Sequence, residues 1–205
     1  MIAIVDYGVG NLFSLKSSLA AAGSDPVVSG DPEVLEKADK LLLPGVGAFG
    51  DAAQKLRKSG ISQLILDMAR KGTPLLGICL GMQLLFEKSY EYGEHEGLGL
   101  IPGTVNPIAG RIPAEYKIPH IGWNRLRFPE NRQRSPLFRE LKQGDYVYFV
   151  HSYAAINCDA YVSAVTDYGK PLTAAVERDN VFGCQFHPEK SGPVGLAILD
   201  AFCKL

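Results

Sequence analysis

The chain carries the sequence PLLGICLGMQLLF at residues 74–86, and this stretch decides the fold. An apolar run from Pro74 to Ile78 predicts a buried strand, and an amphipathic segment from Leu80 to Phe86 predicts a helix. Cys79 stands between them, with Gly77 and Gly81 two residues away on either side. A sharp turn from strand to helix needs small residues beside the bend, and it lifts the side chain at the bend clear of the backbone. The pattern is typical of a nucleophile elbow, although a buried cysteine in an ordinary strand-to-helix connection would give the same sequence.

A second segment, GCQFHPEK at residues 183–190, supplies partners for a nucleophilic thiol. His187 and Glu189 lie two residues apart, and the intervening Pro188 favours an extended chain before it, in which such side chains point the same way. Glu189 could then accept a hydrogen bond from one ring nitrogen of His187 and leave the other nitrogen for Cys79. A helix N-terminus beside Cys79 would further favour the thiolate. We therefore expect a catalytic triad of Cys79, His187 and Glu189, with a surface histidine in a turn as the alternative.

The first half of the chain alternates between candidate strands and candidate helices. Strands are expected at residues 2–5, 27–29, 41–43 and 74–78, and helices at residues 11–22 and 51–70, the latter interrupted near Gly60. This alternation predicts an α/β fold, with a doubly wound, mostly parallel sheet covered by helices on both faces. In such sheets the chemistry lies at the carboxyl ends of the strands.

The second half has a different pattern, in which glycine, proline and aromatic residues separate short segments. From Leu98 to Tyr168, segments such as 121–128 and 146–151 predict antiparallel strands added to one edge of the sheet. Residues 172–177 and 181–186 predict a hairpin that delivers His187, and residues 193–202 predict a closing helix. We find no linker or internal repeat, so residues 1–205 are expected to form a single domain.

The loop Pro44-Gly45-Val46-Gly47 follows a candidate strand and should emerge at the same sheet edge as Cys79. A loop with two glycines can turn backbone N–H groups toward a developing oxyanion, and the amide of Leu80 supplies another donor. We therefore expect Leu80, Gly45, Val46 and Gly47 to form an oxyanion hole. A tight turn after a strand explains this short motif equally well.

Composition excludes several classes of function. Hydrophobic residues make up 46% of the 205 residues, and the formal net charge of -1 gives no electrostatic case for binding nucleic acid or an anionic membrane. The four cysteines and four histidines show no metal-ligand spacing, so neither a metal nor another cofactor is expected. The N-terminus predicts a strand rather than a signal peptide, and no apolar stretch is long enough to span a bilayer. A cytoplasmic location follows as the expectation.

The motifs together resemble those of the class I, triad-type glutamine amidotransferases, whose fold is flavodoxin-like. The resemblance extends over nearly the whole chain, and it is most specific to the glutaminase subunits of imidazole glycerol phosphate synthases. No motif position departs from that pattern. The motifs that carry the resemblance are IVDYGVGNL (4–12), PGVGAFG (44–50), GICLGMQ (77–83), HIGWN (120–124), YFVHSY (148–153) and FHPEKS (186–191).

This resemblance implies an activity and a partner. The chain would hydrolyse glutamine to glutamate and ammonia and form a heterodimer with a cyclase subunit. The cyclase would use the ammonia to give imidazole glycerol phosphate and an aminoimidazole carboxamide ribotide in histidine biosynthesis. By the same resemblance, glutamine would be held by Gln83, Glu91, His151, Ser152 and Tyr153, and the partner interface would contain Asn11, Trp123, Tyr148 and Lys190.

The sequence leaves three alternatives open. A free-standing cysteine hydrolase of related fold, such as a peptidase or γ-glutamyl hydrolase, would act without a partner. The glutaminase subunit of another amidotransferase would use a different partner. A non-catalytic homologue that only binds a synthase would have no need of an intact Cys79, His187 and Glu189.

Overall fold

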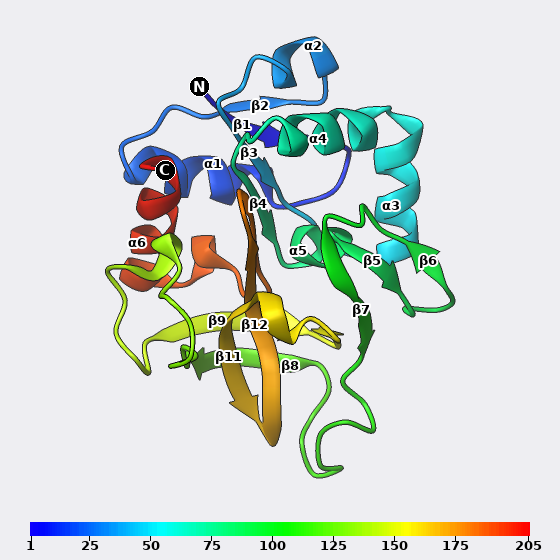
Figure 1. Ribbon diagram of the computed structural model, residues 1–205, viewed down its shortest axis with the longest axis vertical. Coiled ribbons are helices and arrows are strands. Elements are labelled where there is room, and N and C mark those ends of the chain that lie inside the picture. Colours follow the sequence, from blue (N-terminus) through cyan, green and yellow to red (C-terminus); the bar gives the residue numbers. More distant parts are fainter.

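A seven-stranded sheet forms the centre of the computed structural model, which describes residues 1–205 (Figure 1). Five neighbouring strands of this sheet are parallel, and two antiparallel strands extend it at one edge. The strand order is β11-β12-β13-β4-β3-β1-β2. The strands are β1 (Ile2–Val5), β2 (Val27–Ser29), β3 (Lys40–Leu43), β4 (Leu75–Ile78), β11 (Val162–Tyr168), β12 (Lys170–Arg178) and β13 (Val181–Cys184).

Helices cover both faces of this sheet, which confirms the doubly wound α/β prediction. Side chains alternate along each buried strand, so that Leu42 and Leu76 face one core while Leu41 and Leu75 face the other. The first core also contains residues of α1 (Leu12–Ala21) and α6 (Gly192–Cys203), and the second contains residues of α2 (Pro32–Leu35), α3 (Phe49–Lys58), α4 (Ile61–Arg70) and α5 (Leu80–Leu84). As predicted, the helical region before Arg70 is interrupted at Gly60, whose φ of 76° ends one helix and begins the next.

The second half of the chain departs from the prediction in part. Strands β11 and β12 extend the main sheet as antiparallel edge strands, whereas the segments predicted at 121–128 and 146–151 pair with each other in a two-stranded sheet. This small sheet consists of β8 (His120–Arg125) and β9 (Tyr146–His151). An antiparallel bridge between Arg127 and Val165 of β11 connects it to the edge of the main sheet. A further four-stranded sheet has the order β10-β7-β5-β6, with β5 (Phe86–Ser89), β6 (His95–Glu96), β7 (Ile101–Pro107) and β10 (Tyr153–Ile156). The local pattern predicted β8 and β9 but not their pairing with each other, and it did not single out β5, β6, β7 or β10.

The predicted helix from Leu80 to Phe86 is also shorter than expected. The helix ends at Leu84, and Phe86 begins β5, where it pairs with Ile101 of β7. Backbone N–H groups of residues 98–101 donate to carbonyl oxygens of Leu84, Leu85 and Phe86, so tertiary pairing replaces the next helical turn. Three short 3-10 helices complete the fold, namely η1 (Pro136–Phe138), η2 (Asp159–Tyr161) and η3 (Pro188–Lys190).

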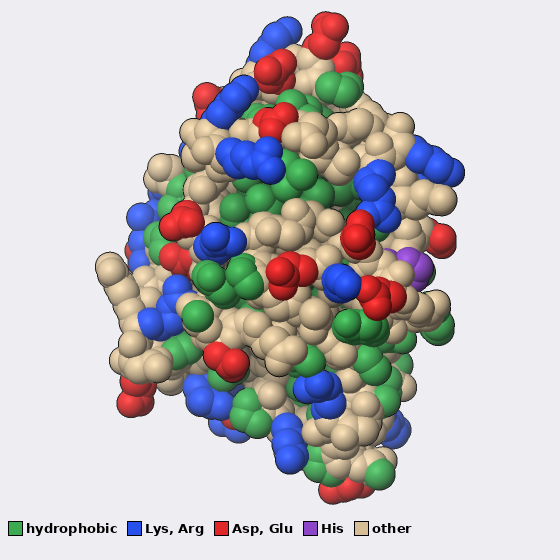
Figure 2. All heavy atoms as spheres, turned by 45° about the vertical axis from the view of Figure 1, so that its right-hand side comes forward, with side chains coloured by type: hydrophobic (Ala, Val, Ile, Leu, Met, Phe, Trp, Pro, Cys, Tyr) green, Lys and Arg blue, Asp and Glu red, His purple; other side chains and the backbone are tan.

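The topology brings the predicted motifs to one edge of the main sheet. Strands β3, β4 and β13 are neighbours, and the segments at residues 44–47, Cys79 and 185–190 leave their carboxyl ends. Acidic and basic side chains are interspersed over the face shown in Figure 2, in keeping with the net charge of -1. None of the helices combines the length and the apolar character needed to cross a bilayer.

Candidate active site

Cys79 occupies a sharp bend between β4 and α5, with φ of 54° and ψ of −111°. A residue with a side chain rarely adopts such a positive φ, so the surrounding structure must enforce it. The bend packs directly against the end of β3, where a Cβ atom at position 81 would collide with the carbonyl oxygen of Leu43. At position 77 a Cβ would lie 2.6 Å from the carbonyl oxygen of Gly81. Both positions therefore require glycine because there is no room for a Cβ atom, and not because the backbone needs glycine's conformational freedom.

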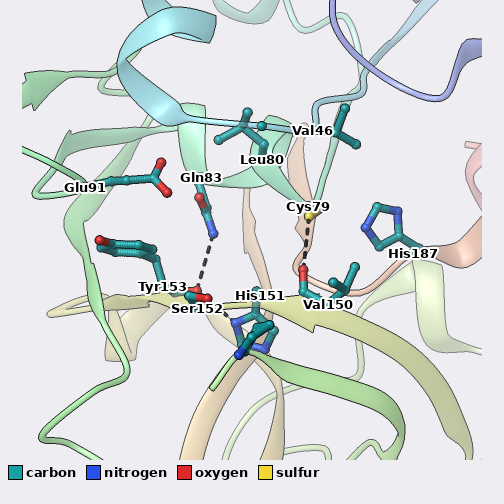
Figure 3. A pocket seen from close by; sticks show the side chains of 12 residues that line it. Val46, Cys79, Leu80, Gln83, Glu91, Val150, His151, Ser152, Tyr153 and His187 are labelled. Atoms are coloured by element: carbon teal, nitrogen blue, oxygen red, sulfur yellow. Dashed lines mark hydrogen bonds between the residues drawn. The ribbon is translucent and has the colours of Figure 1, made fainter. Parts of the chain in front are cut away.

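His187 and Glu189 form a buried pair beside this bend. His187 Nδ1 lies 2.7 Å from Glu189 Oε1, and each side chain is only 4% exposed. Figure 3 shows the His187 ring next to Cys79, and its Nε2 atom makes no hydrogen bond within the protein. Burial alone would lower the pKa of His187, but the acceptor atoms and charges of Cys79 and Glu189 outweigh it and raise the pKa to about 9.

A cleft of about 400 Å³ opens beside Cys79, a size typical of small-molecule sites. Ten of the residues singled out from the sequence line it, together with Pro119 and Val150. The thiol of Cys79 points to the Val150 carbonyl oxygen at 4.0 Å (Figure 3). The lining residues are Val46, Gly47, Cys79, Leu80, Gln83, Glu91, Pro119, Val150, His151, Ser152, Tyr153 and His187.

Contacts with Tyr7 and Gly81 hold the loop at residues 44–47 beside the bend at Cys79. Tyr7 Oη donates to the Pro44 carbonyl oxygen at 2.8 Å, and burial followed by the nearby Cys79 raises the pKa of Tyr7, which keeps this donor protonated. A Cβ at Gly45 would lie 2.9 Å from the Gly81 backbone nitrogen, so the loop and α5 touch backbone to backbone. Leu80 is the first residue of α5, and its N–H therefore has no partner within the helix.

Gln83 and Glu91 reach the cleft from different elements. Gln83 is 6% exposed, and its Nε2 donates to the Tyr153 carbonyl oxygen at 3.3 Å and to Gln185 Oε1 at 3.0 Å. Glu91 accepts a hydrogen bond at 2.6 Å from the N–H of Phe49, the first residue of α3. The Glu91 carboxylate thus caps a helix and also lines the cleft (Figure 3).

A chain of hydrogen bonds runs from His151 to β8. His151 Nδ1 lies 2.8 Å from the Tyr153 carbonyl oxygen, and its Nε2 lies 3.0 Å from His120 Nδ1. His120 Nε2 in turn lies 3.3 Å from Asn124 Nδ2. Because a carbonyl oxygen only accepts, each ring must carry its proton on Nδ1 and accept on Nε2. Burial lowers the pKa of both histidines to about 4, so both rings are neutral at ordinary pH.

Three of the residues expected at a partner interface lie together on the surface. Trp123, which is 55% exposed, packs edge-on against Tyr148 with ring centroids 6.1 Å apart. Lys190 Nζ lies 5.8 Å from the Tyr148 ring. We call Trp123, Tyr148 and Lys190 the aromatic cluster. Asn11 lies outside it, where its side chain caps α1 and lines a small cavity with His187 and Glu189.

Sequence reasoning did not assign several residues that the structure places at the site. Pro119 and Val150 line the cleft, Tyr7 holds the glycine loop, and His120 and Gln185 join the buried hydrogen bonds. All five lie within the quoted motifs or next to them. Their roles depend on contacts between distant segments, which spacing along the chain does not reveal.

We predict that His120 and His151 stay neutral and protonated on Nδ1 between pH 8 and about pH 5, because both pKa values lie near 4. Long-range ¹H–¹⁵N spectra of histidine-labelled protein would report the tautomer of each ring, with His120→Gln and His151→Gln used for assignment. A ring that carries its proton on Nε2, or one that titrates near pH 6.5, would contradict this chain of hydrogen bonds.

Sequence comparison identifies relatives over the whole chain. The model of the family described as glutamine amidotransferase class-I matches residues 3–204. The chain is 49% identical over 207 residues to the imidazole glycerol phosphate synthase subunit HisH of Wolinella succinogenes, covering 100% of both chains. It is 50% identical to the protein of the same name from Sulfurimonas denitrificans, covering 100% of this chain and 98% of that one.

The fold has relatives among solved structures as well. The structure of PurLQS from Thermotoga maritima superimposes with a TM-score of 0.76 at 22% sequence identity, covering 99% of this chain and 97% of that one. At this level of identity the likeness concerns the fold alone. The sequence matches go further, and by them this chain belongs to the class I glutamine amidotransferase family and, within it, to the imidazole glycerol phosphate synthase subunits HisH.

Proposed function

We propose that this chain is the glutaminase of an imidazole glycerol phosphate synthase, with residues 1–205 acting as one glutamine amidotransferase domain. It hydrolyses L-glutamine to glutamate and ammonia and passes the ammonia to a cyclase subunit. The observation that carries this proposal is the cysteine at a strained bend, with a buried histidine–carboxylate pair beside it and an open cleft in front. The four free cysteines suit a reducing compartment, and we place the protein in the cytoplasm.

Acylation of Cys79 is the first chemical step. The thiolate attacks the side-chain carboxamide carbon of glutamine and forms a C–S bond, and the carbonyl electrons move onto oxygen. His187, held by Glu189 at 2.7 Å, donates its Nε2 proton to the departing nitrogen. The C–N bond then breaks, ammonia leaves, and a glutamyl thioester remains on Cys79.

Hydrolysis of the thioester regenerates the thiol. His187, now neutral, takes a proton from water, which attacks the thioester carbonyl and releases glutamate. In both steps negative charge develops on the same substrate oxygen. We assign the stabilisation of this charge to the amide of Leu80 and the loop of Gly45, Val46 and Gly47. Removing one such donor typically costs about 2.7–4 kcal/mol of barrier. The orientation of this loop can therefore switch the reaction on or off.

Glutamine itself is held by the residues across the cleft from the elbow. Gln83, Glu91 and the segment His151-Ser152-Tyr153 line the cleft on the side away from His187 (Figure 3). The carboxylate of Glu91 suits the α-ammonium group of the substrate. The backbone and amide groups of the other residues suit its carboxylate.

The cyclase subunit docks, on this proposal, at the aromatic cluster. The cluster is joined to the triad through the backbone, because the His187 N–H donates to the Tyr148 carbonyl oxygen at 2.9 Å. Docking at this place would close the cleft next to the nucleophile and give the ammonia a route into the partner. An oxyanion loop that turns toward the substrate only in the complex would prevent wasteful hydrolysis of glutamine.

The proposal predicts weak release of glutamate by this chain alone and strong release when it is combined with a cyclase subunit and the cyclase's nucleotide substrate. Cys79→Ala should abolish release under every condition, because no thioester can form. The control is Cys203→Ala at the end of α6, which should behave as the unmodified protein. Strong release without a partner would indicate a free-standing hydrolase, and no release in the loaded complex would indicate a binding subunit.

The pKa of about 9 for His187 predicts the alkaline limit of the reaction. As the pH rises through 9, His187 loses the proton that it gives to ammonia, so kcat/KM for glutamine in the complex should fall above this pH. Glu189→Gln removes a charge that raises this pKa, and the alkaline limb should move to lower pH. Glu96→Gln, at an exposed position in β6, is the matched control. An alkaline limb that stays in place in Glu189→Gln would contradict the assigned pair.

The aromatic cluster predicts where the partner binds. Trp123→Ala should weaken affinity for the cyclase subunit about 30-fold, because a central aromatic anchor contributes about 2 kcal/mol. Tyr116→Ala removes an exposed aromatic side chain outside the cluster and should leave affinity unchanged. Titration calorimetry with both variants would measure the effect. Equal affinities for the two variants would place the interface elsewhere.

A further inference from the structure

The buried amide of Gln185 takes no part in the proposed acylation and hydrolysis steps. Gln185 follows β13 directly, two residues before His187, and its side chain is fully buried behind the elbow. Its Nε2 atom lies 3.8 Å from Cys79 Sγ, within hydrogen-bonding distance for sulfur. Its Oε1 atom accepts from Gln83 Nε2 at 3.0 Å. Gln185 therefore contacts the Cys79 sulfur without lining the cleft.

A single backbone carbonyl fixes which end of the Gln185 amide faces the sulfur. The Tyr153 carbonyl oxygen lies on β10, an edge strand, and side chains rather than another strand use it as an acceptor. Since this oxygen can only accept, Gln83 must present its NH₂ group to it. The same NH₂ group lies against Gln185, which must present its oxygen there and turn its own NH₂ group toward Cys79.

The second donor to the Tyr153 carbonyl oxygen makes this arrangement firm. His151 Nδ1–H occupies the other lone pair at 2.8 Å and is itself held by His120. Both histidines are neutral, so no change in their charge reverses the direction of the hydrogen bonds in the working pH range. The donor that faces Cys79 is thus set by geometry and does not rotate freely.

An N–H group directed at sulfur binds a thiolate more strongly than a thiol. A thiolate is a far stronger acceptor than a thiol, so the hydrogen bond stabilises the ionised form. The Val150 carbonyl oxygen, 4.0 Å from the sulfur on the cleft side, accepts from the thiol and favours the protonated form. We propose that Gln185 is a further catalytic residue, whose Nε2–H group donates to Cys79 and holds it as the thiolate. This inference rests on the proposed role of Cys79 as nucleophile.

The test is the pH profile of Cys79 alkylation, which needs neither glutamine nor a partner. Iodoacetamide would be reacted with the native chain and with Gln185→Met and Gln185→Glu, and labelling at Cys79 followed by peptide mapping. Gln185→Met removes the donor without adding charge, and the acid limb of the profile should move up by about one pH unit. The rate below that limb should fall about tenfold, whereas the rates at high pH should converge.

Gln185→Glu replaces the donor by a carboxylate of the same shape, and its acid limb should move further up. Gln143→Met, a glutamine whose side chain bonds only to the Phe128 backbone, is the matched control and should leave the profile unchanged. If Gln185 had only a structural role, Gln185→Met would lower the melting temperature without moving the acid limb of the alkylation profile. An unchanged limb in folded Gln185→Met would overturn the proposal.

The native protein offers a measurement that does not depend on a variant that folds. In ¹⁵N-glutamine-labelled protein, the side-chain signal of Gln185 should shift with the same midpoint as the alkylation profile and should not shift in Cys79→Ala. A Gln185 signal that is indifferent to Cys79 ionisation would also overturn the proposal. A complex that fails to release glutamate while Gln185 responds as expected would refute the proposed function and leave the thiolate donor intact.

Discussion

The close approach of the β4–α5 bend to the end of β3 is the constraint on which the rest of the structure depends. The carbonyl of Leu43 occupies the space that a side chain at Gly81 would need, and α5 can therefore start directly beside the glycine loop. This approach holds Cys79 at a φ of 54° and brings the first-turn amides of α5 next to Gly45. A larger residue at position 81 would separate Cys79 and the start of α5 from the glycine loop even if His187 and Glu189 stayed in place.

The residues at this close approach belong to the part of the site that could be predicted from the sequence. Cys79 and its glycines form one local pattern, and His187 and Glu189 form another, so both were recognisable without knowledge of the fold. The parallel direction of the central strands could be predicted from the alternation of strands and helices. The pairing of β8 with β9 apart from the main sheet did not follow, because its register joins residues some twenty to thirty positions apart. The early end of α5 likewise results from pairing with residues 98–101.

The buried polar residues show a further limit of local patterns. His120, His151 and His187 are all buried, yet burial lowers the pKa of the first two to about 4, while Cys79 and Glu189 raise that of His187 to about 9. Residue type therefore does not assign the acid–base group. What separates the three rings is that Cys79 and Glu189 lie beside His187, whereas the other two rings face neutral acceptors.

The hydrogen bonds at β9 connect these two sets of histidines through the backbone. Tyr148 accepts from the His187 N–H, and three residues further along the same strand His151 faces His120 across the ladder. Side chains alternate along β8, so that Trp123 lies on the outer face of this small sheet and His120 and Asn124 lie on the inner face. The outer face is exposed to solvent, and the inner face carries the hydrogen bonds that lead to His151. β9 contacts the His187 backbone through the Tyr148 carbonyl oxygen, and it contacts the Tyr153 carbonyl oxygen of β10 through the His151 ring. One small strand is therefore joined to His187 on one hand and, through the Tyr153 carbonyl oxygen, to the Gln83–Gln185 pair beside Cys79 on the other.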